Sequence, residues 1–138
     1  MTFVLDNSVS MRWCFGDGKP SELAYAARVL DELRTATALV PAIWALETAN
    51  VLARAESKGL ISQDRSTAFI ALLCDLRIEF DQATAGHALT DTLALARRHH
   101  LSSYDAAYLE LAFRRQLPVA TLDVDLRKAV RRAGIKLF

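Results

Sequence analysis

Residues 118–123 read PVATLD, a short apolar run that ends at an acidic residue, and the beginning of the chain repeats this arrangement. There, Thr2 to Leu5 is apolar and partly β-branched, and Asp6 follows it directly. Such runs predict strands, because β-branched and apolar side chains favour extended chain and Asp favours the turn or cap that follows. The residues Asp6, Asn7 and Ser8 are accordingly predicted to form a turn.

Apolar residues recur at helical spacing between the predicted strands. Gly16, Gly18 and Pro20 predict a loop before the first of these helices. The predicted helices cover residues 23–35, 43–58, 63–76, 84–99, 103–115 and 124–132, and further strands are predicted at 39–40, 77–80, 118–122 and 135–138.

The alternation of short strands with helices determines the predicted fold class. Parallel strands need long crossover connections, which are usually helical, so this order favours a parallel sheet covered on both faces. We therefore expect an α/β protein, a three-layer α/β/α sandwich with a central, mostly parallel sheet. The length of 138 residues predicts one domain over residues 1–138.

The composition of 52% hydrophobic and 24% charged residues indicates a globular chain and excludes a disordered or collagen-like one. No apolar run approaches the roughly 20 residues that span a bilayer, and no signal peptide is recognisable. We therefore expect no membrane association and a cytoplasmic location. A net charge of +1 gives no global basic field, so any binding of nucleic acid must depend on local patches.

Cys14 and Cys74 are far apart in the sequence and outside any metal-binding spacing. We expect reduced thiols in apolar surroundings, with a disulfide as the alternative. No role is assigned to either residue.

Asp6 and Asp123 both follow a predicted strand directly. Ligands of open α/β sheets bind outside the carboxyl ends of the strands, so these two carboxylates are expected to meet at one edge of the sheet. The alternative is that each Asp only caps a helix, which is a common function of Asp. The repetition of the same arrangement at two strands favours a site.

Three further acidic residues are candidates. Glu47 lies on a narrow polar stripe, with Asn50 and Arg54, in a helix that is otherwise apolar and is expected to be mostly buried. Asp105 lies in the first turn of an apolar helix; compensation of the helix dipole is the alternative explanation for it. Asp125 is a weaker candidate, because a charged residue at a helix start is usually just solvated.

Four segments that contain these acids resemble PIN-domain ribonucleases, and their order and spacing are most similar to the VapC toxins of toxin–antitoxin pairs. The segments are Val4–Ser8 (VLDNS), Glu47–Leu52 (ETANVL), Ser103–Tyr108 (SYDAAY) and Ala120–Asp123 (ATLD). The resemblance covers essentially the whole chain. It implies that Asp6, Glu47, Asp105 and Asp123 form the catalytic, metal-binding cluster, with Asn7, Ser8 and Thr121 as supporting polar neighbours. Asp125 matches a position where acidity varies in the family.

The residue types fit metal-dependent hydrolysis of RNA. Four gathered carboxylates repel one another unless a cation compensates their charge. Oxygen ligands without His or Cys favour Mg²⁺ or Mn²⁺, which would activate water for attack on a phosphodiester. The histidines, His87, His99 and His100, are outside the motifs and are expected to be surface or helix-end residues.

Carboxylates cannot hold a phosphate backbone, so RNA binding must come from basic residues. Arg127, Lys128 and Arg131 recur with Arg132 along the last predicted helix and are the first candidates. Two further pairs of arginines, at 97–98 and 114–115, lie at the ends of two other predicted helices. Solvated surface and partners of a helix dipole are the alternative roles for all of them.

The resemblance also implies partners, namely an RNA substrate, a VapB-like antitoxin and a second copy in a homodimer. A housekeeping RNA-processing PIN nuclease is the nearest alternative. A phosphotransferase with an Asp nucleophile fits less well, because the haloacid-dehalogenase-like pattern places a second Asp where this chain has Ser8. A further alternative is a non-catalytic domain that has the same fold but only binds RNA or protein.

Overall fold

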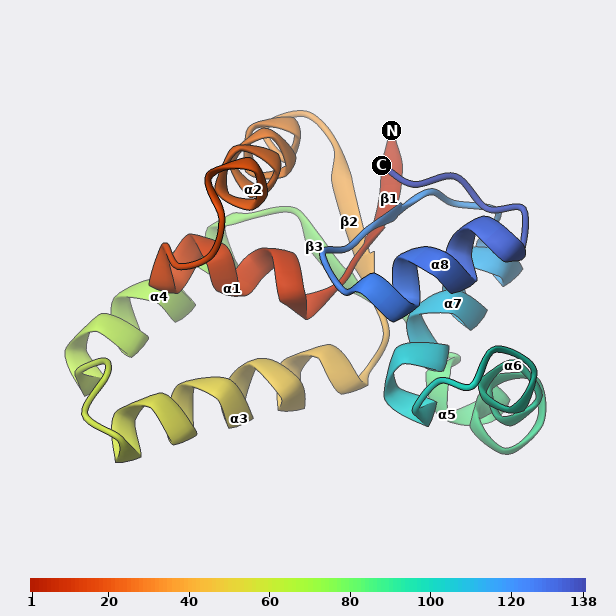
Figure 1. Ribbon diagram of the computed structural model, residues 1–138. Helices are drawn as coiled ribbons and strands as arrows, with labels where there is room; N and C mark the ends of the chain where they lie inside the picture. The colour runs from red at the N-terminus through yellow and green to blue at the C-terminus, as the bar shows by residue number, and fades with distance from the viewer.

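A computed structural model describes residues 1–138 and shows one parallel sheet of four strands with helices on both faces (Figure 1). The strands are β1 (Thr2–Leu5), β2 (Thr37–Val40), β3 (Ile78–Phe80) and β4 (Val119–Ala120), in the spatial order β3-β2-β1-β4. All three strand pairings are parallel. The predicted α/β sandwich with a parallel sheet is thus confirmed.

The helices divide between the two faces of the sheet. Figure 1 shows α1 and α2 on one side and α7 and α8 on the other, with α3 and α4 extending beside α1. The bounds are α1 (Asn7–Phe15), α2 (Pro20–Glu32), α3 (Ile43–Ser57), α4 (Gln63–Asp75), α5 (Thr84–His87), the π-helix η1 (Ala88–Thr92), α6 (Leu93–His99), α7 (Ser103–Arg115) and α8 (Val124–Arg132). No helix is both long enough and apolar enough to cross a membrane.

On the face of the sheet that α7 and α8 cover, helix α7 makes the main contact with the strands. Every residue from Ala106 to Ala112 is buried, and the helix packs against β1 and β4. The side chain of Ser102 accepts a hydrogen bond from the Asp105 backbone N–H at 3.1 Å and so fixes where the helix begins. The start of α7, including Asp105, is therefore held at a fixed place beside the sheet.

The sequence-based prediction for the segment after Asp6 is wrong, because this segment forms helix α1 and not only a turn. The helix has nine residues and mixes polar Ser10 with Val9, Met11 and Cys14 on its buried side, so its apolar periodicity is weak. It ends at Gly16, which adopts a left-handed conformation (φ 61°) that favours glycine.

Three other predicted segments are shorter or more divided than expected. The helix predicted at 84–99 is split into α5, η1 and α6. The strand predicted at 118–122 covers only two residues, and the one predicted at 135–138 is reduced to a single parallel bridge between Leu137 and Val119. Both termini lie close together (Figure 1), and the ring centroids of Phe3 and Phe138 are 4.5 Å apart.

The two cysteines are free, as expected, but only Cys14 is buried. Cys74 is exposed, against the prediction that both thiols are packed in apolar surroundings.

Candidate functional site

Asp6 lies where β1 ends and is only 4% exposed. Pairing of β1 with β4 places Leu5 opposite Ala120, and the Asp6 backbone N–H donates to the Ala120 carbonyl at 2.9 Å. This register brings the next residue of each chain segment, Asp6 and Thr121, side by side. The Thr121 hydroxyl donates to Asp6 Oδ2 at 2.7 Å.

Ser8 completes the support of the Asp6 carboxylate. Its hydroxyl donates to Asp6 Oδ2 at 2.6 Å and accepts the Leu122 backbone N–H at 3.0 Å. Because both hydroxyls donate to Oδ2, Oδ1 has no side-chain hydrogen bond. One oxygen of Asp6 is thus fixed while the other stays free to bind a ligand.

Asp123 follows β4 and begins α8. Its Oδ1 accepts the Leu126 backbone N–H at 2.8 Å, and its own N–H donates to Thr121 Oγ1 at 3.0 Å. The capping role considered from the sequence is thus real for Asp123, whereas the side chain of Asp6 makes no cap. A cap uses one carboxylate oxygen of Asp123 and leaves the second available.

Glu47 lies on α3 and is half-buried. The Tyr108 hydroxyl on α7 donates to Glu47 Oε1 at 2.5 Å. Asn7 donates to Thr48 Oγ1 at 2.8 Å and ties the start of α1 to α3. Two side-chain hydrogen bonds therefore fix α3 against the elements that carry Asp6 and Asp105.

The prediction that α3 is mostly buried is wrong. Leu46 is 68% exposed, and Ala45, Ala49, Asn50, Ala53 and Arg54 are exposed as well. The helix extends from the sheet and buries one face only, so its alanine-rich side is open. Glu47 borders a hollow of about 390 Å³ that Asn7 and Tyr104 also line.

The pKa values show that the four carboxylates lie in one electrostatic neighbourhood. Burial raises the pKa of Glu47 to about 7, and the charges of Asp6 and Asp105 contribute. Burial raises the pKa of Asp105 to about 6, with contributions from Asp123, Asp6 and Asp125. Burial, opposed by the hydrogen bonds from Ser8 and Thr121, also raises the pKa of Asp6. The group is costly to ionise without a cation.

These shifts predict a pH dependence of stability without metal. The folded-state pKa values of Glu47 and Asp105 lie above the unfolded values of 4.5 and 3.8. Their stabilising contribution is therefore complete below about pH 4 and is lost as the pH rises through about 6 to 7. In EDTA, Tm is expected to fall between pH 5 and pH 8, whereas Glu47→Gln and Asp105→Asn should flatten this fall. An exposed control, Glu32→Gln, should leave the profile unchanged; a profile that is equally steep in all variants contradicts the prediction.

Divalent metal fits the donor set. All four side chains offer hard oxygen ligands, and their charge is uncompensated, since no Lys, Arg or His forms an ion pair with any of them. Their oxygens are not closely grouped: the only triad of ligand atoms within 4.8 Å of one another belongs to His87, Asp91 and Glu110. Mg²⁺ suits a wide carboxylate site, because it retains several waters that extend its reach.

The remaining predicted residues lie along α8. Asp125 is exposed, and its charge acts on Asp105. Arg127 donates to the Thr121 carbonyl at 2.8 Å, and its guanidinium carbon is 5.8 Å from the centre of the Tyr25 ring. Lys128 and Arg131 are exposed. Arg127 thus braces the β4–α8 connection, and the other two have free side chains.

Sequence reasoning missed the roles of Tyr108 and Thr48. Tyr108 comes three residues after Asp105, so the two lie on neighbouring positions of one helix face. This spacing could have identified Tyr108 from the sequence as a neighbour of the site. No signal identifies Thr48, because its partner Asn7 is 41 residues away.

Comparison with known proteins identifies the family. The PIN domain family model matches residues 3–131, and the chain belongs to this family, whose members are nucleases. Comparison with curated protein sequences gives no significant match.

Three solved structures share the fold. VapBC2 of Rickettsia felis, bound to a DNA fragment from its promoter, has a TM-score of 0.68 and 10% identity over 100% of this chain and 98% of that chain. PAE2754 of Pyrobaculum aerophilum has a TM-score of 0.64 and 19% identity over 94% and 87% of the two chains. FitAcB of Neisseria gonorrhoeae has a TM-score of 0.63 and 19% identity over 100% and 96%.

Proposed function

We propose that residues 1–138 act as one metal-dependent endoribonuclease domain with Asp6, Glu47, Asp105 and Asp123 as its metal-binding residues. The observation that carries this proposal is the pairing of β1 with β4, which places buried Asp6 beside the Thr121–Asp123 turn. Membership of a nuclease family supports it. A buried carboxylate with two hydroxyl donors and no cation partner is hard to explain by stability alone.

The chain's own residues prepare the site for a cation. Ser8 and Thr121 orient Asp6, Tyr108 orients Glu47, and the cap at α8 orients Asp123. Mg²⁺ or Mn²⁺, when bound, would lower the pKa of a water and offset the charge that develops on the phosphate. The free energy needed to ionise the carboxylates then comes from metal binding. Asp125 is proposed as an outer metal-binding residue.

RNA binding is proposed for the exposed start and side of α8. Lys128 and Arg131 have side chains in solvent, as electrostatic contact with a phosphate backbone requires. Arg127 is proposed to act there as well, although its bond to the Thr121 carbonyl also gives it a structural role.

The biological role proposed is that of a VapC-type toxin, located in the cytoplasm, which forms a homodimer and is held by a VapB-like antitoxin. Support comes from the likeness of the fold to VapBC2 and FitAcB. An apolar groove of about 380 Å³ between α3, α4 and β3 also supports protein partners, because Ile70 and Phe80 in its lining are 48% and 43% exposed.

Incubation of purified protein with a mixed cellular RNA pool tests the proposed activity. We expect discrete fragments in Mg²⁺ or Mn²⁺ and none in EDTA, with activity restored when metal is added back. Absence of cleavage by folded, partner-free protein in either metal would overturn the proposal. A small antitoxin gene next to this one would separate a toxin from a housekeeping nuclease, and co-purification of the two products would test the partnership.

A further inference from the structure

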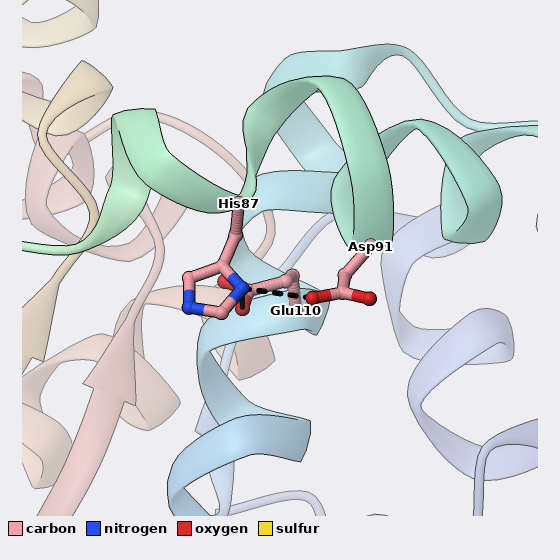
Figure 2. A group of neighbouring side chains, drawn as sticks. All are labelled: His87, Asp91 and Glu110. Carbon is pink, nitrogen blue, oxygen red and sulfur yellow. Dashed lines mark hydrogen bonds and ion pairs between the residues drawn. The ribbon is translucent and has the colours of Figure 1, made fainter.

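A second group of ligand-type side chains lies outside the four-carboxylate site (Figure 2). His87 ends α5, Asp91 lies in η1, and Glu110 projects from α7 toward both of them. His87 Nδ1 is 2.8 Å from Asp91 Oδ2 and 3.5 Å from Glu110 Oε1. His87 is thus a helix-end residue, as predicted, and it also belongs to a group of ligand-type side chains.

The two candidate sites use different faces of α7. Asp105 and Glu110 are five residues apart, which is a rotation of about 140° around a helix of 3.6 residues per turn. One face carries Asp105 toward the ends of β1 and β4. The other carries Glu110 toward α5 and η1, so the two groups can bind ligands independently.

The spacing of the three ligand atoms suits a small transition-metal ion. In a tetrahedral zinc site, with bonds of about 2.0–2.2 Å, neighbouring ligand atoms are about 3.3–3.6 Å apart. The 3.5 Å distance to Glu110 Oε1 lies within that range, and the 2.8 Å distance to Asp91 Oδ2 is shorter. An ion could be bound with small side-chain movements, and His87 and Asp91 are open to solvent, with side chains 32% and 65% exposed.

The charge of the group also favours a divalent cation. Arg114 forms ion pairs with Glu110 at 2.7 Å and with Asp81 at 2.7 Å. Three carboxylates and one guanidinium leave a net charge of −2 when His87 is neutral. Arg98 and Arg132 line the same pocket as His87, Asp91 and Glu110, but neither lies within ion-pair distance of a carboxylate there.

Arg114 does not block Glu110. A carboxylate oxygen has two lone-pair positions, so Glu110 Oε1 can accept from Arg114 Nε and still bind a metal. Metal-binding carboxylates are usually held in this way by a hydrogen bond from a neighbouring group. Arg114 thus fixes the one ligand that comes from α7.

We propose that His87, Asp91 and Glu110 bind a divalent transition-metal ion, with Zn²⁺ as the first candidate. An imidazole beside two carboxylates favours Zn²⁺ over Mg²⁺, because nitrogen ligands suit the softer ion. Three protein ligands leave a fourth position for water. The ion would join α5 and η1 to α7.

Isothermal titration calorimetry with Zn²⁺ tests this site, using the full chain in excess Mg²⁺ so that the four-carboxylate site is saturated. Co²⁺, with its visible absorption bands, reports the coordination number in parallel. The ligand variants are His87→Gln and Asp91→Asn, both at positions open to solvent. The controls are His100→Asn, an exposed histidine outside the group, and Asp6→Asn in the other site.

We expect one equivalent of Zn²⁺ in the wild type, in His100→Asn and in Asp6→Asn, with a tetrahedral or five-coordinate Co²⁺ spectrum. Zn²⁺ affinity should fall at least about tenfold in His87→Gln and in Asp91→Asn, since even the loss of a supporting residue costs about 10–100-fold. No Zn²⁺ binding in the wild type, or equal affinity in His87→Gln, would overturn the site and identify the group as an ion-pair network only. The readout is binding, so the result does not depend on whether the protein cleaves RNA.

Discussion

Replacement of Asp6 by Asn is expected to reduce RNA cleavage at least about a hundredfold, because loss of even a supporting residue at a metal site costs about 10–100-fold. Asp6 is the most buried of the four acids, and its Oδ1 is free of side-chain partners. The change leaves one oxygen for Ser8 or Thr121 and removes the negative charge that a cation requires.

Asp105→Asn is the companion variant, because Asp105 is half-buried and tolerates replacement better than Asp6. We expect a similar loss of cleavage with the circular dichroism spectrum unchanged. Glu32→Gln, an exposed acid on α2, is the matched control and should cleave at the wild-type rate. The cleavage rate is measured at several Mg²⁺ concentrations, so that weaker metal binding can be separated from slower chemistry. Full activity in both folded variants would exclude the proposed site.

Arg114→Ala is expected to destabilise the protein by about 3–5 kcal/mol, since removal of one partner leaves uncompensated buried charges. Arg114 donates to Glu110 and to Asp81, whose side chains are only 4% and 3% exposed. Burial opposes ionisation of Asp81, but the bonds from Arg114 and Thr84 outweigh it and lower the pKa of that carboxyl. The guanidinium therefore holds the end of β3 against α7.

Urea unfolding in EDTA, followed by circular dichroism, measures this effect. Arg115→Ala removes the exposed neighbouring charge on the same helix and should change stability by no more than about 0.5 kcal/mol. In a Glu110→Gln, Asp81→Asn background, Arg114→Ala should lower the free energy of unfolding much less, because no buried charge is left unpaired. An equal loss of unfolding free energy in the two backgrounds would show that Arg114 acts through packing and not through charge.

The fold class could be predicted because it depends on local patterns. Apolar runs such as Thr2–Leu5 and the helical spacing at 103–115 are local signals, and their alternation implies a parallel sheet. The prediction was wrong where the local signal was weak, at α1 and at the C-terminal strand. In α1, polar Ser10 interrupts the apolar pattern and is buried nonetheless.

The acid types, their order and their places near strand and helix ends could be predicted from the sequence alone. Those features follow from local preferences and from the motif resemblance. The contacts around these acids come from the tertiary fold: the hydroxyls of Ser8 and Thr121 donate to Asp6, and the Tyr108 hydroxyl donates to Glu47. The same packing brings His87 beside Glu110 in the second group. These contacts join residues up to 115 positions apart. They depend on strand register and helix rotation, which packing of the whole chain fixes and no local pattern encodes.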